Sequence, residues 1–272
     1  MKANNLTISI PTVSPRCDKN CPYCISEITW KTKPNPALML SNLKKVKNLI
    51  KVSGVSNILI TSKGEPFLNK EMLQIIMMEF RDYWLEIQTN GLQLKRNIHD
   101  FVTLLSAGQV NIVAFSVDQP WDVVDLSFVF KRLEDFGIIS RVCLNITDRF
   151  KDYFCNGLME NAKVNGVKQL LFRNINYPSN ADKENKAVKW IDKNVDKMIY
   201  IRLHKEMMEM NLPIIREIKE TETKTFDYNG ISVCFSDYCI QEKNEVSDIR
   251  SLIFHEDGHV YTSWNTPASI LF

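Results

Sequence analysis

The sequence lacks several features that would point to a particular class of protein. Its 34 basic and 32 acidic residues leave a formal net charge of only +2, which predicts no strong attraction to nucleic acid or membrane. No apolar run approaches the roughly 18 residues needed to span a bilayer. The first residues, Met1–Thr7, are too polar for a secretory signal. Neither a low-complexity segment nor a repeat is present, apart from a recurring strand–helix cycle described below.

Cysteine is present in an odd number and without regular pairing, seven in 272 residues. This usage favours reduced thiols over a disulfide framework. Together with the missing secretory signal, it leads us to expect a cytoplasmic protein.

Strands and helices alternate along most of the chain. We expect strands at 6–10, 58–61, 85–89, 112–117, 141–145 and 169–173. We expect helices at 41–52, from Asn69 onward, and at 97–107, 123–136 and 157–164. Six such units favour a parallel sheet with right-handed crossovers. The predicted fold class is α/β, a partial (β/α)6 TIM-like barrel with a small β-rich C-terminal extension.

The pattern changes after the sixth unit, which suggests three segments. Residues 1–180 would form the (β/α)6 core, 181–225 a helical connection, and 226–272 the β-rich extension. In the extension, turn signals occur at Asn229-Gly230 and Asp257-Gly258.

Polar residues follow the predicted strands at the ends where parallel α/β folds bind ligands. The third strand ends in Thr89-Asn90-Gly91. We expect all of these polar groups to face one rim. The others are three cysteines, Ser62–Pro66, Ser116, Asp118, Asn145, Thr147, Arg173 and Asn174.

The three cysteines after the first strand, Cys17, Cys21 and Cys24, have the spacing C-x3-C-x2-C. They supply three ligands, whereas a structural zinc site takes four. An iron–sulfur cluster can accept three thiolates and leave one iron open to another molecule. The spacing therefore favours a cluster with an open iron.

The cysteine loop, with Tyr23 just before its third cysteine, resembles the cluster loop of the radical SAM superfamily. Gly64-Glu65-Pro66 resembles the family's "GGE" motif, and Thr89-Asn90-Gly91 is also common in the family. The resemblance covers roughly residues 6–178. Lys63 departs from the pattern, because it stands where the first glycine of the motif usually lies.

The resemblance implies a [4Fe–4S] cluster and S-adenosyl-L-methionine (SAM) as cofactors. Cys17, Cys21 and Cys24 would each hold one iron, and the fourth iron would bind SAM. A one-electron cleavage of SAM would give a 5′-deoxyadenosyl radical that abstracts hydrogen from substrate. The reducing electron would come from a donor such as flavodoxin or ferredoxin.

The resemblance also implies roles for residues at the other strand ends. Gly64 and Glu65 would bind the methionine ammonium of SAM. Asn90, in the Thr89-Asn90-Gly91 motif, would also bind this cofactor. Tyr23 and the backbone near Phe172 would pack on adenine. Ser116 and Asp118 are candidates for the ribose hydroxyls. Asn145 is a candidate for the ribose or the methionine carboxylate, and Arg173 for that carboxylate or an anionic substrate.

The remaining cysteines and the histidines near the C-terminus are less informative. Cys143 and Cys155 are expected in the core. Cys234 and Cys239, with His255 and His259, leave two interpretations open: a zinc site, or a hairpin without metal. The Asp257-Gly258 turn between the histidines favours the hairpin.

The sequence does not identify the substrate, which is a peptide or a small metabolite. The alternatives are a non-catalytic zinc- or iron-binding α/β protein, a glycyl-radical activating enzyme, and an RNA-modifying radical SAM enzyme. The near-neutral charge and the lack of clustered arginines speak against extensive phosphate contact.

Overall fold

A computed structural model describes residues 2–218, 223–236, 249–264 and 266–272. The chain divides into two compact units, which are described separately. The first unit comprises Met1–Val113 and Glu242–Phe272, and the second comprises Ala114–Gln241. The division falls within strand β4 (Val110–Val117).

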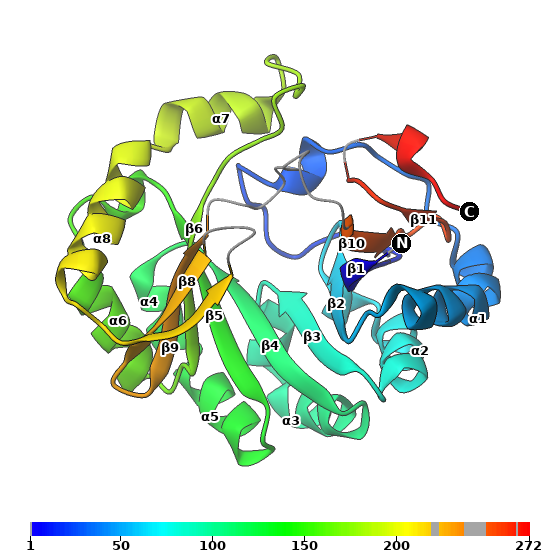
Figure 1. Ribbon diagram of the computed structural model, residues 1–272, viewed down its shortest axis with the longest axis horizontal. Helices are drawn as coiled ribbons and strands as arrows, with labels where there is room; N and C mark the ends of the chain where they lie inside the picture. The colour runs from blue at the N-terminus through cyan, green and yellow to red at the C-terminus, as the bar shows by residue number, and fades with distance from the viewer. Residues whose placement is uncertain (1, 219–222, 237–248, 265) are drawn as a thin grey trace. The chain divides into compact units, whose positions relative to one another are not determined.

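The sheet of the first unit has the strand order β11-β10-β1-β2-β3 (Figure 1). The pairs β10–β1, β1–β2 and β2–β3 are parallel, and β10–β11 is antiparallel. Because β1, β2 and β3 run in the same direction, the segments that follow them leave from one edge of the sheet. The strands are β1 (Ala3–Ile10), β2 (Asn57–Ser62), β3 (Trp84–Thr89), β10 (Ile249–Phe254) and β11 (Val260–Tyr261).

Three helices of the first unit lie on the outer side of β1, β2 and β3 (Figure 1). They bury apolar side chains such as Val46 and Ile76, while Leu6, Ile8 and Ile10 of β1 are fully buried. The strands therefore read as apolar runs, as expected of parallel strands covered on both faces. The helices are α1 (Pro36–Ser53), α2 (Lys70–Phe80) and α3 (Leu92–Ala107), with short 3₁₀ turns η1 (Ile25–Glu27) and η2 (Pro66–Leu68).

Two of these helices begin earlier than the sequence predicts. Helix α1 begins at Pro36 rather than at Ser41, because the Asn35 side chain accepts a hydrogen bond from the Leu38 amide and proline fits the first helical position. Helix α3 begins at Leu92, and a kink at Asn97 marks the start that the sequence predicted.

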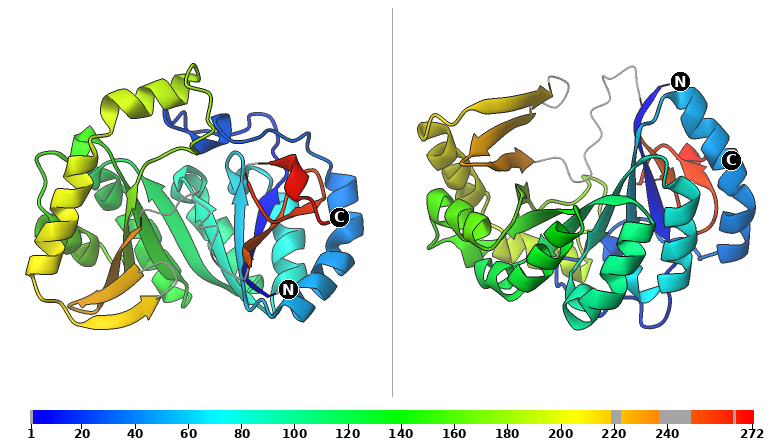
Figure 2. Two further views of the ribbon diagram at one scale, coloured as in Figure 1. Left: turned by 45° about the horizontal axis from the view of Figure 1, so that its top comes forward. Right: turned by 90° about the horizontal axis from the view of Figure 1, so that it is seen from below.

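In the second unit the strand order is β5-β6-β9-β8-β7 (Figure 2). The pairs β5–β6 and β6–β9 are parallel, and β9–β8 and β8–β7 are antiparallel. The strands are β5 (Ile139–Ile146), β6 (Gln169–Asn174), β7 (Ile214–Ile218), β8 (Thr223–Tyr228) and β9 (Ile231–Ser236). The helices are α4 (Pro120–Asp125), α5 (Ser127–Asp135), α6 (Cys155–Val164), α7 (Lys186–Asn194) and α8 (Lys197–Glu209), with the 3₁₀ turn η3 (Asp148–Phe150).

The helix predicted at 123–136 is in fact two helices, α4 and α5, which meet at Leu126. The core of this unit includes the Phe172 and Phe235 rings, stacked with centroids 4.3 Å apart. Cys143 and Cys155 are buried, as predicted.

The C-terminal strands do not form a single extension. Strands β8 and β9 continue the sheet of the second unit beside β6, whereas β10 pairs with β1 in the first unit. The turn signals are confirmed: Asn229-Gly230 joins β8 to β9, and Gly258, with φ of 87°, lies in the turn between β10 and β11. The boundaries 1–180, 181–225 and 226–272 stay a prediction. Within the described ranges, no helix combines the length and apolarity needed to cross a membrane.

Candidate active site

The cysteine loop leaves the carboxyl end of β1 in the first unit and runs to the start of α1. Cys17, Cys21 and Cys24 are not in disulfides, and each is half-buried. The Cys24 amide donates to the Cys21 carbonyl at 3.1 Å, closing a turn that contains Tyr23. Tyr23 is itself half-buried.

Cys17 is the thiol with the best-defined surroundings. Its Sγ accepts hydrogen bonds from the Lys19 amide at 3.4 Å and from Asn90 Nδ2 at 3.6 Å. Burial raises the pKa of the Cys17 thiol, the hydrogen bonds from Lys19 and Asn90 lower it, and the charges of Glu65 and Asp18 raise it further. Because the net shift is upward, the thiolate needs a cation at the sulfur to form readily.

The donor chemistry of the loop fits an iron–sulfur cluster better than a single metal ion. Within the part of the chain that the structure describes, no three His, Cys, Asp or Glu side chains lie close enough together to hold one metal ion. Three thiolates on three separate irons need not converge on one point, as the ligands of zinc must. The amide groups that reach the Cys17 sulfur are typical of the hydrogen bonds that tune such clusters.

Asp18, beside the first cysteine, ties the loop to helix α3. Its carboxylate accepts hydrogen bonds from Asn90 Nδ2 at 2.8 Å, Gln93 Nε2 at 2.8 Å and Arg96 Nη1 at 3.1 Å. Sequence reasoning missed this residue. Its charge next to a cysteine was the available signal, but its partners lie more than 70 positions away.

Glu65 joins the ends of β2 and β3. One carboxylate oxygen accepts from Thr89 Oγ1 at 2.8 Å and from the Phe67 amide at 3.2 Å, and the other accepts from the Asn90 amide at 2.8 Å. The side chain is buried. Burial raises the pKa of Glu65 to about 7, against the hydrogen bonds, which lower it. The Gly-Glu-Pro and Thr-Asn-Gly motifs are therefore one hydrogen-bonded unit.

Gly64 lies against the backbone of the cysteine loop. The amide of Glu65 donates to the Arg16 carbonyl at 3.1 Å, and a Cβ on Gly64 would stand 1.8 Å from that carbonyl oxygen. A side chain at this position is therefore excluded by the loop itself.

Lys63, the departure from the family pattern, has its side chain buried toward the end of the loop. Its Nζ donates to the Trp30 carbonyl and lies 5.9 Å from the centroid of the Trp30 ring. Burial lowers the pKa of Lys63 to about 8, and the charge of Glu256 partly offsets this by favouring the ammonium form.

The other predicted residues belong to the second unit. Asp118 and Asn145 are buried, and Asn145 Nδ2 donates to Asp118 Oδ1 at 3.3 Å. Arg173 is the register partner of Asn145 on the neighbouring strand β6. Ser116, in β4, is half-buried. The structure thus brings Asp118 and Asn145 together, and brings Gly64, Glu65 and Asn90 together with Cys17 in the first unit.

The cysteines and histidines of the C-terminal region do not form a described metal site. Cys234 lies on β9, where burial raises the pKa of its thiol to about 11. Cys239 lies outside the described residues. His255 is fully buried, and its ring packs against Trp30, Tyr261 and Trp264. The zinc site and the hairpin without metal both stay predictions.

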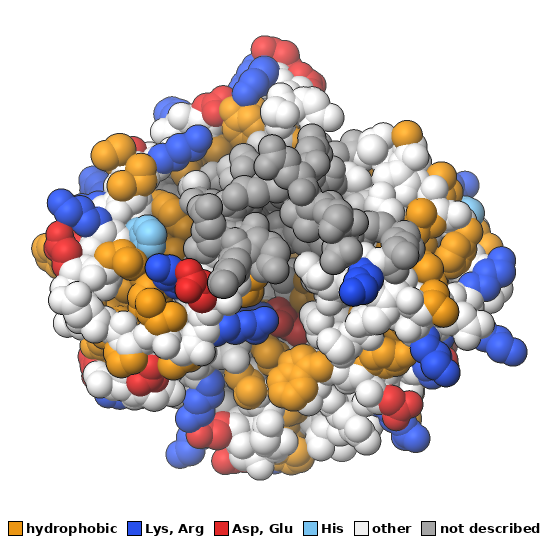
Figure 3. Space-filling view, viewed as in Figure 1, with side chains coloured by type: hydrophobic (Ala, Val, Ile, Leu, Met, Phe, Trp, Pro, Cys, Tyr) orange, Lys and Arg blue, Asp and Glu red, His pale blue; other side chains and the backbone are white. Residues whose placement is uncertain are grey.

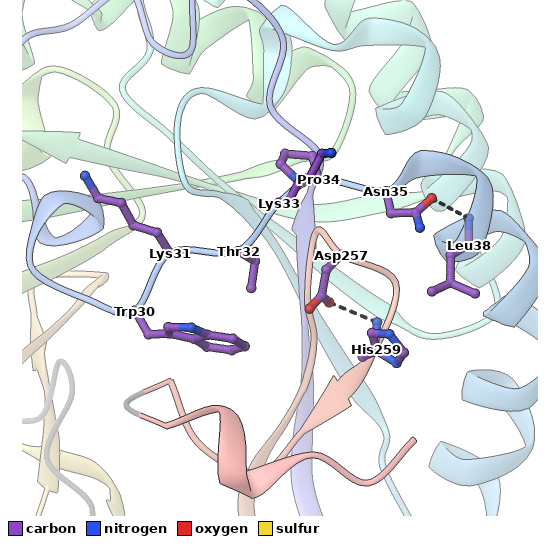
Figure 4. Close-up of a pocket in the computed structure, with 9 residues that line it drawn as sticks. All are labelled: Trp30, Lys31, Thr32, Lys33, Pro34, Asn35, Leu38, Asp257 and His259. Carbon is purple, nitrogen blue, oxygen red and sulfur yellow. Dashed lines mark hydrogen bonds between the residues drawn. The ribbon is translucent and has the colours of Figure 1, made fainter.

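Each unit also has a pocket. In the first unit, a pocket of about 620 Å³ lies between the end of the cysteine loop, the start of α1 and the β10–β11 turn, and includes Trp30, Asn35 and His259 (Figure 4). In the second unit, one of about 690 Å³ is lined by residues after β6 and from α7 and α8, including Asn174, Tyr200 and His204. Neither pocket is lined by a residue that we predicted to bind the cluster or SAM.

A family model described as "Radical SAM superfamily" matches residues 12–157, more than half of the chain. No curated protein matches the sequence.

Solved structures of SuiB from Streptococcus suis share the fold. The structure bound to precursor peptide SuiA has a TM-score of 0.61 at 14% identity, covering 96% of this chain and 59% of that one. The structure bound to S-adenosylmethionine has a TM-score of 0.58 at 13% identity, covering 96% and 60%. The chain thus corresponds to about three fifths of the length of SuiB. Together with the parallel strand pairs, this likeness confirms the predicted α/β class of a partial TIM-like barrel.

Proposed function

The chain belongs to the radical SAM superfamily, and we propose that it is an enzyme that removes a hydrogen atom from a peptide substrate. The superfamily uses a [4Fe–4S] cluster and SAM, which supply a 5′-deoxyadenosyl radical by one-electron cleavage of a carbon–sulfur bond. The protein's part is to hold both cofactors, exclude water and present one C–H bond of the substrate.

The observation that carries the proposal is the position of Asn90. Its Nδ2 contacts both the Cys17 sulfur and the Asp18 carboxylate, while its amide donates to Glu65. All three family motifs therefore meet at one residue, Asn90, through its side chain and its backbone amide. In our proposal Cys17, Cys21 and Cys24 hold the cluster, and Asn90 and the Lys19 amide orient the Cys17 sulfur.

Glu65 has a defined part in this arrangement. Its carboxylate oxygens already accept three hydrogen bonds within the protein. Two of these bonds hold Thr89 and Asn90 in position. With Gly64, Glu65 would then meet the methionine ammonium of SAM through its remaining lone pairs and its charge. On the family resemblance, Tyr23 and, in the second unit, Ser116, Asp118, Asn145 and Arg173 are further proposed SAM-binding residues. Asp118 and Asn145 form a hydrogen-bonded pair.

A peptide is the proposed substrate because a protein of the same fold, SuiB, has been crystallised with a precursor peptide. Nucleic acid is less well supported. On the face drawn in Figure 3, lysine and arginine side chains are interspersed with acidic ones instead of gathering in one patch, and extensive phosphate contact needs such a patch. A flavodoxin or ferredoxin would supply the electron.

The cofactor part of the proposal is tested on protein reconstituted with iron and sulfide without oxygen. We expect a brown protein that converts SAM to 5′-deoxyadenosine when dithionite is added. Replacing Cys17, Cys21 and Cys24 together with alanine should abolish both properties, whereas the matched control Cys143→Ala should keep both. A colourless wild-type protein that binds zinc and leaves SAM intact would contradict the proposal.

The substrate part is tested by transfer of label. Short open reading frames next to the gene are searched for candidate peptides, and each candidate is synthesised with deuterium in its side chains and added to the active enzyme. We expect deuterium in the 5′-deoxyadenosine and a mass decrease in the peptide. If instead a fraction of small metabolites acts as substrate and peptides do not, the peptide assignment is wrong while the reaction class stands.

A further inference from the structure

A fully buried carboxylate, Glu256, lies in the turn that follows β10 in the first unit. Its Oε2 accepts from the Thr12 amide and from Thr12 Oγ1, each at 3.4 Å. Its Oε1 accepts from Thr32 Oγ1 at 3.1 Å and from Arg16 Nη2 at 3.4 Å. A buried charge persists only when such donors surround it.

These partners lie at the two ends of the cysteine loop. Thr12 and Arg16 precede the first cysteine, and Thr32 follows the third. The Glu256 carbonyl also accepts from the Asn35 amide at 2.8 Å, where the loop passes into α1. One residue of a distant segment therefore fixes the loop's beginning and its end.

Arg16 connects Glu256 to the cluster ligands. Its side chain pairs with Glu256, its carbonyl accepts from the Glu65 amide, and the next residue is Cys17. Since Gly64 leaves no room beside that carbonyl, a shift of Arg16 would move Cys17 and the Gly-Glu-Pro motif together.

The side chain of Lys63 holds the loop's far end from a second direction, through the Trp30 carbonyl. The Trp30 ring packs on His255 with centroids 5.6 Å apart and on Tyr261 at 5.1 Å. Figure 4 shows Trp30 and Thr32 on the strip of loop that faces the β10–β11 turn, with Asp257 opposite. The family's glycine position is thus occupied by a lysine that serves this packing.

We propose that Glu256 is a positioning residue, which fixes both ends of the cysteine loop so that its three thiols are arranged before the cluster binds. Each loop residue ordered in advance is one whose conformational entropy is not lost at cluster binding. The effect on the cluster rests on the proposed function, whereas the ordering of the loop does not.

The ordering is tested on protein without a cluster, by amide hydrogen exchange of peptides covering residues 12–32. We expect exchange several-fold faster in Glu256→Gln than in wild type, because the amide keeps the shape of the side chain but loses its charge. Asp257→Asn is the matched control: its carboxylate accepts only from the His259 amide at 3.0 Å and from Tyr261 Oη at 2.7 Å among the described bonds. It should leave the loop's exchange at the wild-type rate.

The consequence for the cluster is tested by the rate at which an iron chelator removes it. Loss of a supporting group around a metal site typically costs roughly 10–100-fold in affinity, so Glu256→Gln should release iron about tenfold faster. If Glu256 acts through Arg16, the double variant Arg16→Met/Glu256→Gln should release iron no faster than the faster single variant. Asp257→Asn should match wild type.

The outcomes separate the two proposals. If wild type never holds a cluster, the proposed function fails, and hydrogen exchange still decides whether Glu256 orders the loop. Wild-type exchange in residues 12–32 and wild-type iron release in Glu256→Gln, even with reduced global stability, would overturn the positioning role.

Discussion

The two compact units differ in how they fill the region around their predicted site residues. In the first unit, buried ionisable side chains are held by hydrogen bonds: Lys63 by Trp30, Glu65 by Thr89 and Asn90, and Glu256 by the loop ends. In the second unit, the rings of Phe172 and Tyr200 pack around Phe235. Among the predicted site residues of this unit, Asn145 donates a hydrogen bond to Asp118.

The difference indicates how closely each unit fixes the positions of its side-chain atoms. Hydrogen bonds depend steeply on distance and angle, so a network of them fixes atoms closely. Apolar packing tolerates exchange of side chains of similar volume. The first unit is thus suited to hold the cluster in one geometry, and the second can exchange apolar core side chains of similar volume without losing its fold. The predictions below test this contrast in order of decreasing effect.

The largest effect on stability is expected in the second unit. Phe235→Ala removes the ring stacked on Phe172 and should lower the free energy of unfolding by about 3–5 kcal/mol, measured by urea denaturation. Iron content after reconstitution, per folded chain, should remain as in wild type. Phe154→Ala, at a ring that is 71% exposed, should change neither quantity. If folded Phe235→Ala lost iron, the packing of the second unit would also be needed to hold the cluster, and the contrast between the units would be wrong.

The next effect is a pH dependence located in the first unit. The pKa of Glu65 rises from 4.5 to about 7 on folding, so protonated Glu65 is favoured in the folded state. Its contribution to stability is fully present below pH 4.5 and is lost as the pH rises through 7. The shift corresponds to a loss on the order of 2–3 kcal/mol.

Urea denaturation of cluster-free wild type and Glu65→Gln at pH 5 and pH 8 measures this. We expect the wild type to lose stability between the two pH values relative to Glu65→Gln. Parallel profiles for wild type and Glu65→Gln would mean that Glu65 does not titrate in this range.

Glycine substitutions should have opposite signs in the two units. Gly64→Ala places a Cβ against the Arg16 carbonyl and should cost about 1–3 kcal/mol, with reduced iron content. Gly157→Ala, in the first turn of α6 with nothing within 4 Å of the new Cβ, should raise the free energy of unfolding by about 0.4–1 kcal/mol. An unchanged iron content in Gly64→Ala would refute the close approach of the loop.

The smallest effects are expected at exposed ion pairs, in both units alike. Arg96→Met removes the pair with Asp18, and Lys168→Met the pair with Glu134. Each should change the free energy of unfolding by less than about 1 kcal/mol. A tenfold loss of iron affinity in Arg96→Met alone would show that Asp18 needs this charge to position Cys17, and would sharpen the contrast.

Local patterns predicted much of the fold. The strand predicted at 58–61 is β2, and Asn69 caps α2, because both follow from residues close together in the chain. The start of α1 was predicted wrongly. Serine is a favoured N-cap residue, but Ser41 lies inside the helix, which Asn35 caps and Pro36 begins.

The rest depended on contacts that periodicity does not encode. Nothing in Lys63 alone indicates that its side chain is buried toward Trp30, and nothing in Glu256 indicates that it meets Thr12 across 244 positions. The separation of the C-terminal strands also escaped prediction, because strand type can be read from a segment but its partner strand cannot. The assignment of residues to SAM stays a prediction throughout, for Glu65 and Asn90 as for Ser116 and Arg173.

The parallel pairing of β1 with β10 has a consequence for how the protein is made. Ala3 pairs with Ile249, so the edge of β1 that pairs with β10 stays without its partner strand until the ribosome has synthesised all the residues between these two. At about 5–20 residues per second, that wait is on the order of 12–50 seconds. Throughout it, Glu256 does not yet exist and the ends of the cysteine loop lack their anchor. Under the proposed positioning role of Glu256, iron loading is therefore expected only after the β10–β11 turn has been synthesised.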